Sequence, residues 1–460
     1  MNKELLQKLV NKGLETGADF SEIFYEDKKE INLSLSDAII DDCITKNTKG
    51  LGIRLAKDKE IYYASTNDIS AENLNQKIDE LNLNFDGKRI MPNIVLEEQE
   101  KITKKIEKDY TPSNLNDIKK KMYEYDKYAR SLDDRVIQFT TSLLGSKQNV
   151  VIANSKGRLV EDERILTRFY LKVIVKENNV VESAAISFAS SVGLETIEDE
   201  RVFKLIEEIT KDAIKKLKSL PAPGGEFPVI ISNLGGTLIH EACGHALEAT
   251  MVSDGTSVLS DKLNLKIANE KVTLIDDGSI LGEWGSTSYD DEGNKTQKNI
   301  LIENGVIKKY LIDELNTRNM AGNISGSGRR EDFSFAPTSR MNNTYLAKGN
   351  DKIEDMIASI DFGLYAKTIG GGQVNPTTGD FTFGILDANI IRNGKIAEPV
   401  KGASLVGNTL EILKEIDMIS DDLCLCPGLC GSLSGWVPVT TGQPTVKINK
   451  ILVGGASNDK

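Results

Sequence analysis

Residues 227–249 read FPVIISNLGGTLIHEACGHALEA, and this stretch decides how the second half of the chain is organised. Its short apolar run predicts a buried strand, and the remainder has the pattern of a helix. Gly235 and Gly236 predict a break between the two. Both histidines of the 460-residue chain, His240 and His245, lie on the helical part. We therefore expect a functional site where this strand passes into the helix.

The segment Leu238–Glu248 separates into two faces when it is plotted at about 100° per residue. Apolar side chains cover one arc. The polar arc consists of His240, Glu241, Gly244, His245 and Glu248. The alternative without a functional site is an amphipathic surface helix with two solvated histidines. Few lysines or arginines lie nearby, whereas a solvent-facing arc normally carries more charge, so the pattern favours a metal site.

A histidine followed by a glutamate, with a second histidine close behind, is typical of hydrolytic zinc sites. Catalytic zinc uses three protein ligands and keeps one position open for water. Glu241 is then the expected general base that takes a proton from this water. Since no histidine remains, the third ligand must be a cysteine or a carboxylate. The candidates are Glu248, Cys243, Cys424, Cys426 and Cys430.

The spacing of the two histidines sets a geometric condition. In a regular α-helix, five residues place two side chains about 140° apart, too far to share one ion easily. We therefore predict one wide turn of the i→i+5 kind between His240 and His245, where Gly244 leaves room. Of the candidate third ligands, Glu248 lies about 12 Å along the axis from His240. Cys243 falls on the apolar arc, and the other cysteines remain open on spacing alone.

The segment LPAPGGEFP, residues 220–228, marks a domain boundary, because three prolines and two glycines follow a long helical pattern. We predict an N-terminal α/β domain at residues 1–222, with a structural or substrate-enclosing role. A β-rich, antiparallel and barrel-like catalytic domain is expected at residues 223–460. The fold class is therefore α+β.

Local patterns support this division. Residues 1–17 and 115–133 have the apolar spacing of amphipathic helices, and residues 167–177 are rich in strand formers. In the second half, IENGVIKK (302–309) and IIRNGKI (390–396) place Asn-Gly between strand-like residues, which predicts hairpins.

Composition excludes several classes of protein. The chain is 39% hydrophobic and 27% charged, as soluble globular proteins are. No apolar run is long enough to span a membrane, and the N-terminus is not a signal peptide, so we expect a cytoplasmic protein. The net charge of −12 argues against direct nucleic-acid binding. Five cysteines, an odd number, do not indicate a disulfide scaffold.

HEACGHALEA, residues 240–249, resembles the signature of the TldD/PmbA metalloproteases, whose TldD branch carries H-E-x-x-x-H. The likeness continues over nearly the whole chain. Its further blocks are Gly285–Leu311, Ser325–Leu346, Ile369–Phe383, Pro399–Asn408 and Cys430–Gly455. The resemblance implies a cytoplasmic zinc peptidase with one Zn²⁺ per active subunit. It further implies cleavage of short or unfolded peptides by a homodimer, or by a heterodimer with a PmbA-type subunit, and a role in dimerisation for residues 1–222.

The resemblance also assigns site residues. Cys430 matches the third zinc ligand of the family, which implies a set of His240, His245 and Cys430 with Glu241 as the general base of peptide-bond hydrolysis. The glycine-rich segment is predicted to line the substrate, with plain turn geometry as the alternative. It comprises Gly370, Gly371, Gly372 and Gln373.

Three further features leave alternatives open. Cys424, Cys426 and Cys430 could instead form a structural or redox site, which would make the chain a non-catalytic metal- or thiol-binding regulatory subunit. In GRRE, residues 328–331, Arg329 or Arg330 could hold a substrate carboxylate or pair with surface acids. YDDEG, residues 289–293, is carboxylate-rich but reads mainly as a turn.

Overall fold

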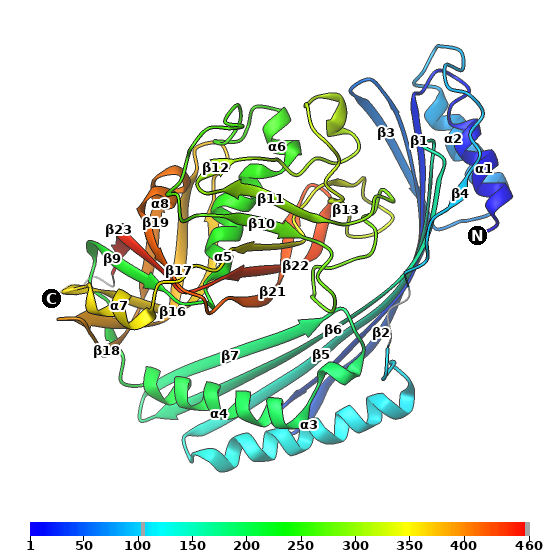
Figure 1. Ribbon diagram of the computed structural model, residues 1–460. Coiled ribbons are helices and arrows are strands. Elements are labelled where there is room, and N and C mark those ends of the chain that lie inside the picture. The colour runs from blue at the N-terminus through cyan, green and yellow to red at the C-terminus, as the bar shows by residue number, and fades with distance from the viewer. Residues whose placement is uncertain (103–105, 456–460) are drawn as a thin grey trace.

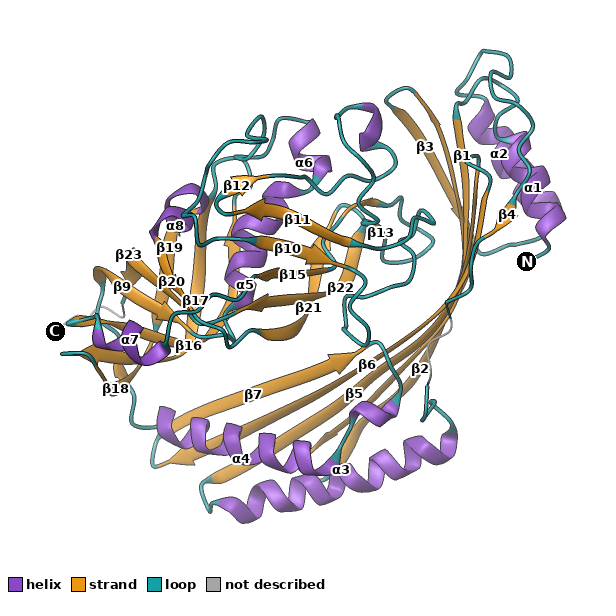
Figure 2. Cartoon of the chain, viewed as in Figure 1, coloured by secondary structure: helices purple, strands orange, loops and turns teal. Residues whose placement is uncertain are grey.

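The computed structural model describes residues 1–102 and 106–455. The fold is mixed α/β with strands in the majority, which confirms the expected α+β class (Figure 2). The first half forms one long twisted sheet that carries four helices. The second half forms a barrel and a second sheet around a short, irregular helix (Figure 1).

Seven strands form the N-terminal sheet, in the order β3-β2-β1-β5-β6-β4, with β7 paired to β6. They are β1 (Phe20–Ser36), β2 (Ile39–Lys57), β3 (Glu60–Thr66), β4 (Glu97–Glu98), β5 (Val136–Asn154), β6 (Arg158–Glu177) and β7 (Val180–Ser190). Strands β1, β2, β5 and β6 have 17 to 20 residues, whereas about five or six is usual. One sheet is therefore long enough to carry two separate helix layers.

Both faces of this sheet are covered, because successive strand residues point to opposite faces. Ile23 and Val151 pack on one face in the core that lies under the N-terminal helices. Phe24 and Ile152, their neighbours in sequence, pack on the other face against Tyr289 of the second half. The covering helices are α1 (Lys3–Lys12), α2 (Ala71–Asn82), α3 (Pro112–Leu132) and α4 (Asp199–Lys216). Helices α1 and α3 confirm the amphipathic helices predicted within residues 1–17 and 115–133.

Five strands of the second half close into a barrel, since β16 pairs with β9 on one side and with β17 on the other. In ring order they are β16 (Phe362–Val374), β9 (Gly225–Ile231), β23 (Val446–Gly454), β19 (Ala403–Asn408) and β17 (Asp380–Arg392). The strands β8 (Leu220–Pro221), β18 (Lys395–Lys401) and β20 (Ile416–Ile419) extend it. The barrel confirms the expected architecture.

A six-stranded sheet lies beside the barrel, in the order β12-β11-β10-β15-β22-β21. Its strands are β10 (Leu274–Asp277), β11 (Lys298–Glu303), β12 (Val306–Ile307), β15 (Asn343–Leu346), β21 (Cys424–Ser432) and β22 (Gly435–Gln443). The second half also contains the ribbon of β13 (Gly328–Arg329) and β14 (Thr338–Ser339), and the helices α6 (Ala249–Ser253), α7 (Ile353–Ala358) and α8 (Thr409–Glu415). Strand β21 is therefore at the edge of the sheet.

Both predicted hairpins are present. Strands β11 and β12 are joined at Asn304 and Gly305, and β17 and β18 are joined at Asn393 and Gly394. All four residues have positive φ, between 48° and 79°. Two-residue turns with positive φ at both positions favour Asn-Gly, which is why the sequence signal was reliable here.

The helix α5 (Gly236–Ile239) lies between the barrel and the six-stranded sheet and packs on β22 and β16. Leu238 of α5, and Ala242 and Ala246 of the turns that follow it, are buried in one core with residues of β16. A side chain at Gly236 would collide with the backbone of Gly442 on β22, so glycine allows this close approach.

The boundary near residue 222 stays a prediction, and the short strand β8 just before it pairs with β18 of the barrel. Within the described ranges, no helix is both long and apolar enough to cross a membrane.

Candidate metal centre

The backbone changes its winding where the histidines lie. Residues His240–Gly244 form one wide π turn, and His245–Leu247 form a tight 3₁₀ turn after it. The predicted wide turn is confirmed. A side chain at Gly244 would overlap the sulfur of the buried Met341, so glycine is needed here. As a result both imidazole rings point to the same side, with their centroids 5.3 Å apart.

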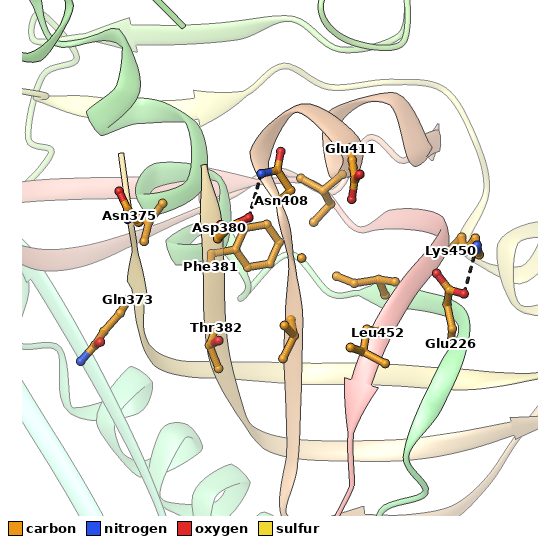
Figure 3. A pocket seen from close by; sticks show the side chains of 15 residues that line it. Glu226, Gln373, Asn375, Asp380, Phe381, Thr382, Asn408, Glu411, Lys450 and Leu452 are labelled. Carbon is orange, nitrogen blue, oxygen red and sulfur yellow. Dashed lines mark hydrogen bonds and ion pairs between the residues drawn. The ribbon is translucent and has the colours of Figure 1, made fainter. Parts of the chain in front are cut away.

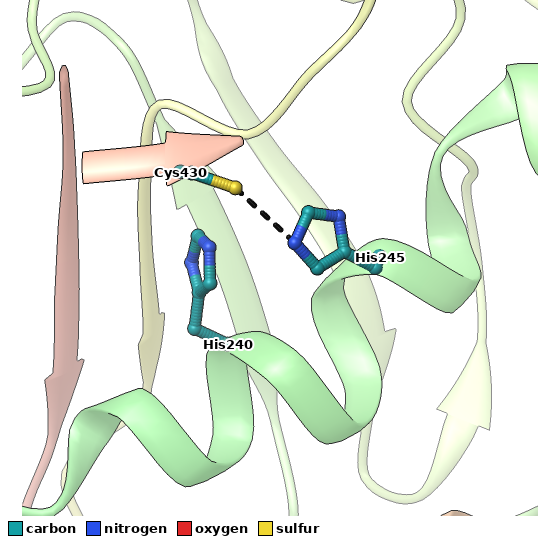
Figure 4. Close-up of side chains that lie close together, drawn as sticks. All are labelled: His240, His245 and Cys430. Carbon is teal, nitrogen blue, oxygen red and sulfur yellow. Dashed lines mark hydrogen bonds between the residues drawn. The ribbon is translucent and has the colours of Figure 1, made fainter. Parts of the chain in front are cut away.

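Cys430 from the edge strand β21 faces the two rings (Figure 4). One ring nitrogen from each histidine and the Cys430 sulfur all lie within 4.8 Å of one another. Nε2 of His245 is 3.1 Å from Sγ of Cys430. Residues 185 positions apart in sequence are thus brought together from a helix and a strand.

The donors fit a metal ion such as zinc. His240 is 1% exposed, and neither of its ring nitrogens has a hydrogen-bond partner among the described residues. Buried polar atoms without a partner are rare, and a cation would satisfy one of these nitrogens. Burial, aided by the charges of His245 and Arg340, holds the pKa of His240 well below its usual value. A neutral imidazole is the form that binds metals, and imidazole with thiolate suits Zn²⁺.

Glu248 orients the second histidine. Its Oε2 lies 3.0 Å from Nδ1 of His245, while its Oε1 accepts the backbone N–H of Met341 at 3.2 Å. Burial acts to lower the pKa of His245, but the charge of Glu248 and the hydrogen bond with Cys430 outweigh it and raise that pKa well above its ordinary value. With Nδ1 occupied, Nε2 is directed at the other donors.

Glu248 was a candidate third ligand, and the structure shows why it contacts the outer nitrogen instead. The helix breaks at Glu248, where the backbone is extended with ψ of 127°, so the side chain turns back on His245. This positioning contact was not predicted from the sequence. The signal that could have found it is the three-residue spacing from His245 on the polar arc.

Glu241 lies beside the donor group and opens toward solvent. Its Oε2 is 3.5 Å from Nε2 of His245, and its side chain is 28% exposed. Burial raises the pKa of Glu241 against the opposing charge of His245. In front of it is a cleft of about 390 Å³, lined by Glu241, His245, Glu248, Met251, Gln373, Val374, Pro376, Gly431 and Ser432.

The glycine-rich segment reaches this cleft at one residue. Gln373 lines it, whereas Gly370, Gly371 and Gly372 lie earlier on β16. A side chain at Gly372 would overlap Phe383 on the neighbouring strand, while Gly371 faces open space. The substrate role of these four residues stays a prediction.

A second groove, of about 590 Å³, adjoins the cleft and shares Gln373 and Val374 with it. Figure 3 shows the side chains that line this groove, Gln373 among them. It is lined by residues of all five barrel strands and of α8, and it contains none of the histidine or cysteine donors. Polar side chains along it are paired with each other: Lys450 lies 3.0 Å from Glu226. The donor group therefore belongs to the smaller cleft.

The other two cysteines of β21 form a pair of their own. The sulfurs of Cys424 and Cys426 are 3.9 Å apart, and neither belongs to the histidine group. The hydrogen bond from Cys426 lowers the pKa of Cys424 to about 7.

The charged turn at residues 289–293 joins the two halves of the chain. Glu292 accepts a hydrogen bond from Arg54 of β2 at 2.8 Å. Arg330 donates to Glu22 of β1 at 2.7 Å, and both side chains are buried. Arg330 therefore pairs with a buried acid rather than with acids on the surface.

Comparisons with known proteins agree over most of the chain. Residues 224–455 match the PmbA/TldA metallopeptidase C-terminal domain, residues 103–217 match the central domain and residues 21–82 match domain 1. The chain is 35% identical to a "Metalloprotease TldD homolog" of Buchnera aphidicola subsp. Acyrthosiphon pisum, over 95% of this chain and 93% of the relative. A "Metalloprotease TldD homolog" of Haemophilus influenzae is 32% identical with the same coverage.

Solved structures show the same fold at lower identity. The crystal structure of TldE from Thermococcus kodakarensis matches with a TM-score of 0.77 at 23% identity, over 98% of this chain and 100% of that one. A putative modulator of a DNA gyrase from Thermotoga maritima MSB8 matches with a TM-score of 0.77 at 20% identity, with the same coverage.

Proposed function

The chain belongs to the TldD/PmbA metallopeptidase family, and from this premise we propose that it is a TldD-type, zinc-dependent peptidase. The observation that carries the proposal is the buried set of two imidazoles and one thiol with a carboxylate beside it and a cleft in front. His240, His245 and Cys430 would hold one zinc ion per active subunit. A zinc ion bound there would polarise the scissile carbonyl and make a water molecule more acidic.

The side chains around the donors have separate tasks. Glu241 is positioned to accept a proton from the attacking water, because it borders both the donor group and the cleft. Glu248 keeps the ring of His245 in place through Nδ1. Arg340 donates to the carbonyl of Cys430 at 2.5 Å and so fixes the strand that carries the thiol.

The substrate would be a short or unfolded peptide bound in extended form. Along one edge of β16, Gln373 pairs with Thr382 of β17. Along the other edge, β9 pairs with β16 only at Leu364–Ala366, well before Gln373. The other edge of β16 at the cleft is therefore available to an added strand. Strand addition satisfies the peptide backbone without selecting one sequence, and a folded protein offers no free strand to add.

The edge of β21 is less available. The carbonyls of Gly428 and Cys430 already accept hydrogen bonds from Trp284 and Arg340. A peptide could meet β21 only at its end near Ser432, which lines the cleft. These contacts favour β16 as the strand that a substrate would extend.

We place the protein in the cytoplasm as a homodimer, or as a heterodimer with a PmbA-type subunit, without direct nucleic-acid or membrane binding. The N-terminal residues 1–222 would help to enclose substrate or join subunits. Native mass spectrometry reports subunit number and zinc per subunit in one measurement, and a metal-free monomer would contradict both parts.

Replacing Glu241 tests the mechanism. Glu241→Gln should keep the zinc content and thermal stability but reduce turnover of an unstructured peptide by about 10²–10⁴-fold, because the proton acceptor is lost. Glu411→Gln, in the neighbouring groove, serves as the control and should keep its activity. Near wild-type turnover in Glu241→Gln would exclude this residue as the general base.

Replacing the cysteines separates this function from the alternative of a thiol-binding regulatory subunit. Cys430→Ala should lose zinc and peptidase activity together, while Cys424→Ala and Cys426→Ala keep both. If zinc stays in Cys430→Ala but is lost from the other two variants, the alternative holds.

A further inference from the structure

A cavity of about 230 Å³ lies between the N-terminal sheet and the second half of the chain. Leu144 of β5 and Ile165 of β6 line one wall. Trp284, Leu429 and Trp436 line the opposite wall, and Trp284 and Trp436 are the only tryptophans of the chain. The cavity shares no lining residue with the metal cleft. It is therefore a separate site, and its walls combine these apolar side chains with charged ones.

The hairpin of β21 and β22 separates the two sites. Side chains alternate along β21, so Cys430 points to the histidines and Leu429 points the other way, into the cavity. Trp436 lies across from Gly431 and is 61% exposed. Its indole is therefore in contact with solvent as well as with the cavity.

Three arginines, Arg164, Arg329 and Arg330, are among the residues that line the cavity, and two of them are matched by acids. Arg164 lies 2.5 Å from Asp291, and Arg330 lies 2.7 Å from Glu22. Arg329 is only 5% exposed, yet no carboxylate of the described residues comes within 4.0 Å of it. Its guanidinium donates one hydrogen bond, from Nη1 to the carbonyl of Met341 at 2.6 Å. Asp291 and Asp276 act on its charge only from beyond ion-pair distance. A buried cation without an ion-pair partner is costly, so a bound anion would stabilise Arg329.

Arg329 remains a cation under ordinary conditions. Burial lowers its pKa to about 10, with the charge of Asp291 opposing and those of Arg340 and Arg164 adding to the effect. A pKa of about 10 still leaves the group protonated at neutral pH. An anionic ligand would therefore find a charged partner here.

The other polar groups at the cavity include one free hydroxyl and charged groups that already have partners. Thr287 lines the cavity, and its buried hydroxyl has no hydrogen-bond partner in the part of the chain that the structure describes. Lys28 is paired with Glu30 at 3.0 Å, so it is less available. Two acids of the wall, Asp290 and Glu331, form no ion pair among the described residues. Asp290 accepts hydrogen bonds from backbone N–H groups, including that of Gly328 at 3.1 Å. The other, Glu331, accepts the backbone N–H of Trp436 at 2.8 Å, so both acids are already hydrogen-bonded.

We infer that this cavity binds a small organic carboxylate with a branched or aromatic apolar group. Arg329 and Thr287 would hold the carboxylate, while Trp284, Leu429 and Trp436 would contact the apolar group. The volume of 230 Å³ matches about eight water molecules at roughly 30 Å³ each, which suits one amino-acid residue. The chemistry is that of an α-carboxylate beside an apolar side chain, found at the C-terminus of a peptide and in a released amino acid.

Tryptophan fluorescence tests this inference without depending on zinc or on peptidase activity. Both tryptophans line the cavity, so a bound ligand should change their emission. The full-length protein is titrated with N-acetyl-leucine and with N-acetyl-leucinamide, which lacks the charge. We expect a saturable change with the acid and an affinity lower by about tenfold or more for the amide. Equal affinities, or no change with the acid, would overturn the inference.

Variants locate the contact. Arg329→Gln should weaken binding of the acid by about tenfold or more and remove its advantage over the amide. Lys28→Gln, which removes a paired cation from the same wall, should bind like wild type. Unchanged acid binding in Arg329→Gln would refute the assignment. If that variant does not fold, the acid–amide comparison on wild type decides, together with Thr287→Val, which should also weaken the acid.

A longer peptide distinguishes the two sources of the carboxylate, the C-terminus of a peptide and a released amino acid. A pentapeptide ending in leucine is compared with N-acetyl-leucine and with the same pentapeptide as its amide. Tighter binding of the peptide acid than of N-acetyl-leucine assigns the cavity to peptide C-termini. Binding of N-acetyl-leucine alone assigns it to a released product, and binding of neither acid overturns the inference.

Discussion

Replacing Glu248 by glutamine should weaken zinc binding although Glu248 is not one of the proposed ligands. Its side chain is 3% exposed, and its two oxygens are both used, at 3.0 Å by Nδ1 of His245 and at 3.2 Å by the backbone N–H of Met341. The guanidinium of Arg340 lies 3.9 Å away. A glutamine can accept from one of these donors, but its NH₂ group then faces another donor.

The expected size follows from the kind of contact. Loss of a carboxylate behind a metal-binding histidine typically costs about 10–100-fold in affinity, or about 1.4–2.7 kcal/mol. We expect Glu248→Gln to lie in this range, and Glu248→Ala at its upper end because two buried donors lose their acceptor. Competition with a chromophoric zinc chelator measures the affinity directly.

The control for this experiment is Glu411→Gln, an exposed carboxylate outside the metal cleft. It should bind zinc as wild type does. The reasoning fails if Glu248→Gln also binds zinc within about twofold of wild type, since the carboxylate would then neither orient His245 nor raise its basicity. Circular dichroism of each variant shows whether the fold is kept.

Three further outcomes are expected. Gly244→Ala should lower the free energy of unfolding by about 1–3 kcal/mol and reduce the zinc content, because the new methyl group overlaps the buried sulfur of Met341. Thermal unfolding and metal analysis measure the two effects. Unchanged stability and zinc content would show that the π turn has room for a side chain. Chelation of zinc should lower the melting temperature, since an ion that binds only the folded chain stabilises it; no shift on adding chelator would contradict the site. Burial raises the pKa of Glu26 to about 7 from 4.5, with Gln148 and Lys28 opposing and Asp332 adding, so the folded chain holds a proton that the unfolded chain loses. The free energy of unfolding should therefore fall by up to about 3 kcal/mol as the pH rises from 4.5 to 7. Denaturant unfolding at pH 5 and pH 8 measures this fall, which should be smaller in Glu26→Gln. An equally large fall in the variant would contradict the role of Glu26.

The features that could be predicted from sequence are those set by short-range geometry. Asn393 and Gly394 can take positive φ more readily than other residues, so the hairpin of β17 and β18 is visible in two letters. The spacing of His240 and His245 by itself requires a wide turn if both rings are to meet at one ion, because imidazoles about 140° apart do not converge. Such inferences need only the chain's own stereochemistry.

The third donor and its supporting contacts depend on long-range packing. Cys430 is 185 residues from His245, and spacing alone could not distinguish it from Cys424 or Cys426. All three lie on β21 with the same parity, yet Cys430 alone among them reaches the histidines. The position of the turns at His240–Leu247 relative to β21 decides between them, and no local pattern records that position.

The adjacent arginines 329 and 330 show the same limit most clearly. In sequence they are equivalent, and both could hold a substrate carboxylate or pair with an acid. On strand β13 and the residue after it they point to different surroundings, so Arg330 meets Glu22 from the N-terminal sheet while Arg329 turns toward Met341. Glu22 lies 308 residues away from Arg330, and it is matched to this arginine only once the N-terminal sheet has folded against the second half. The assignment of a carboxylate ligand to Arg329 therefore rests on which acids the fold brings near each guanidinium, a property that neither residue carries by itself.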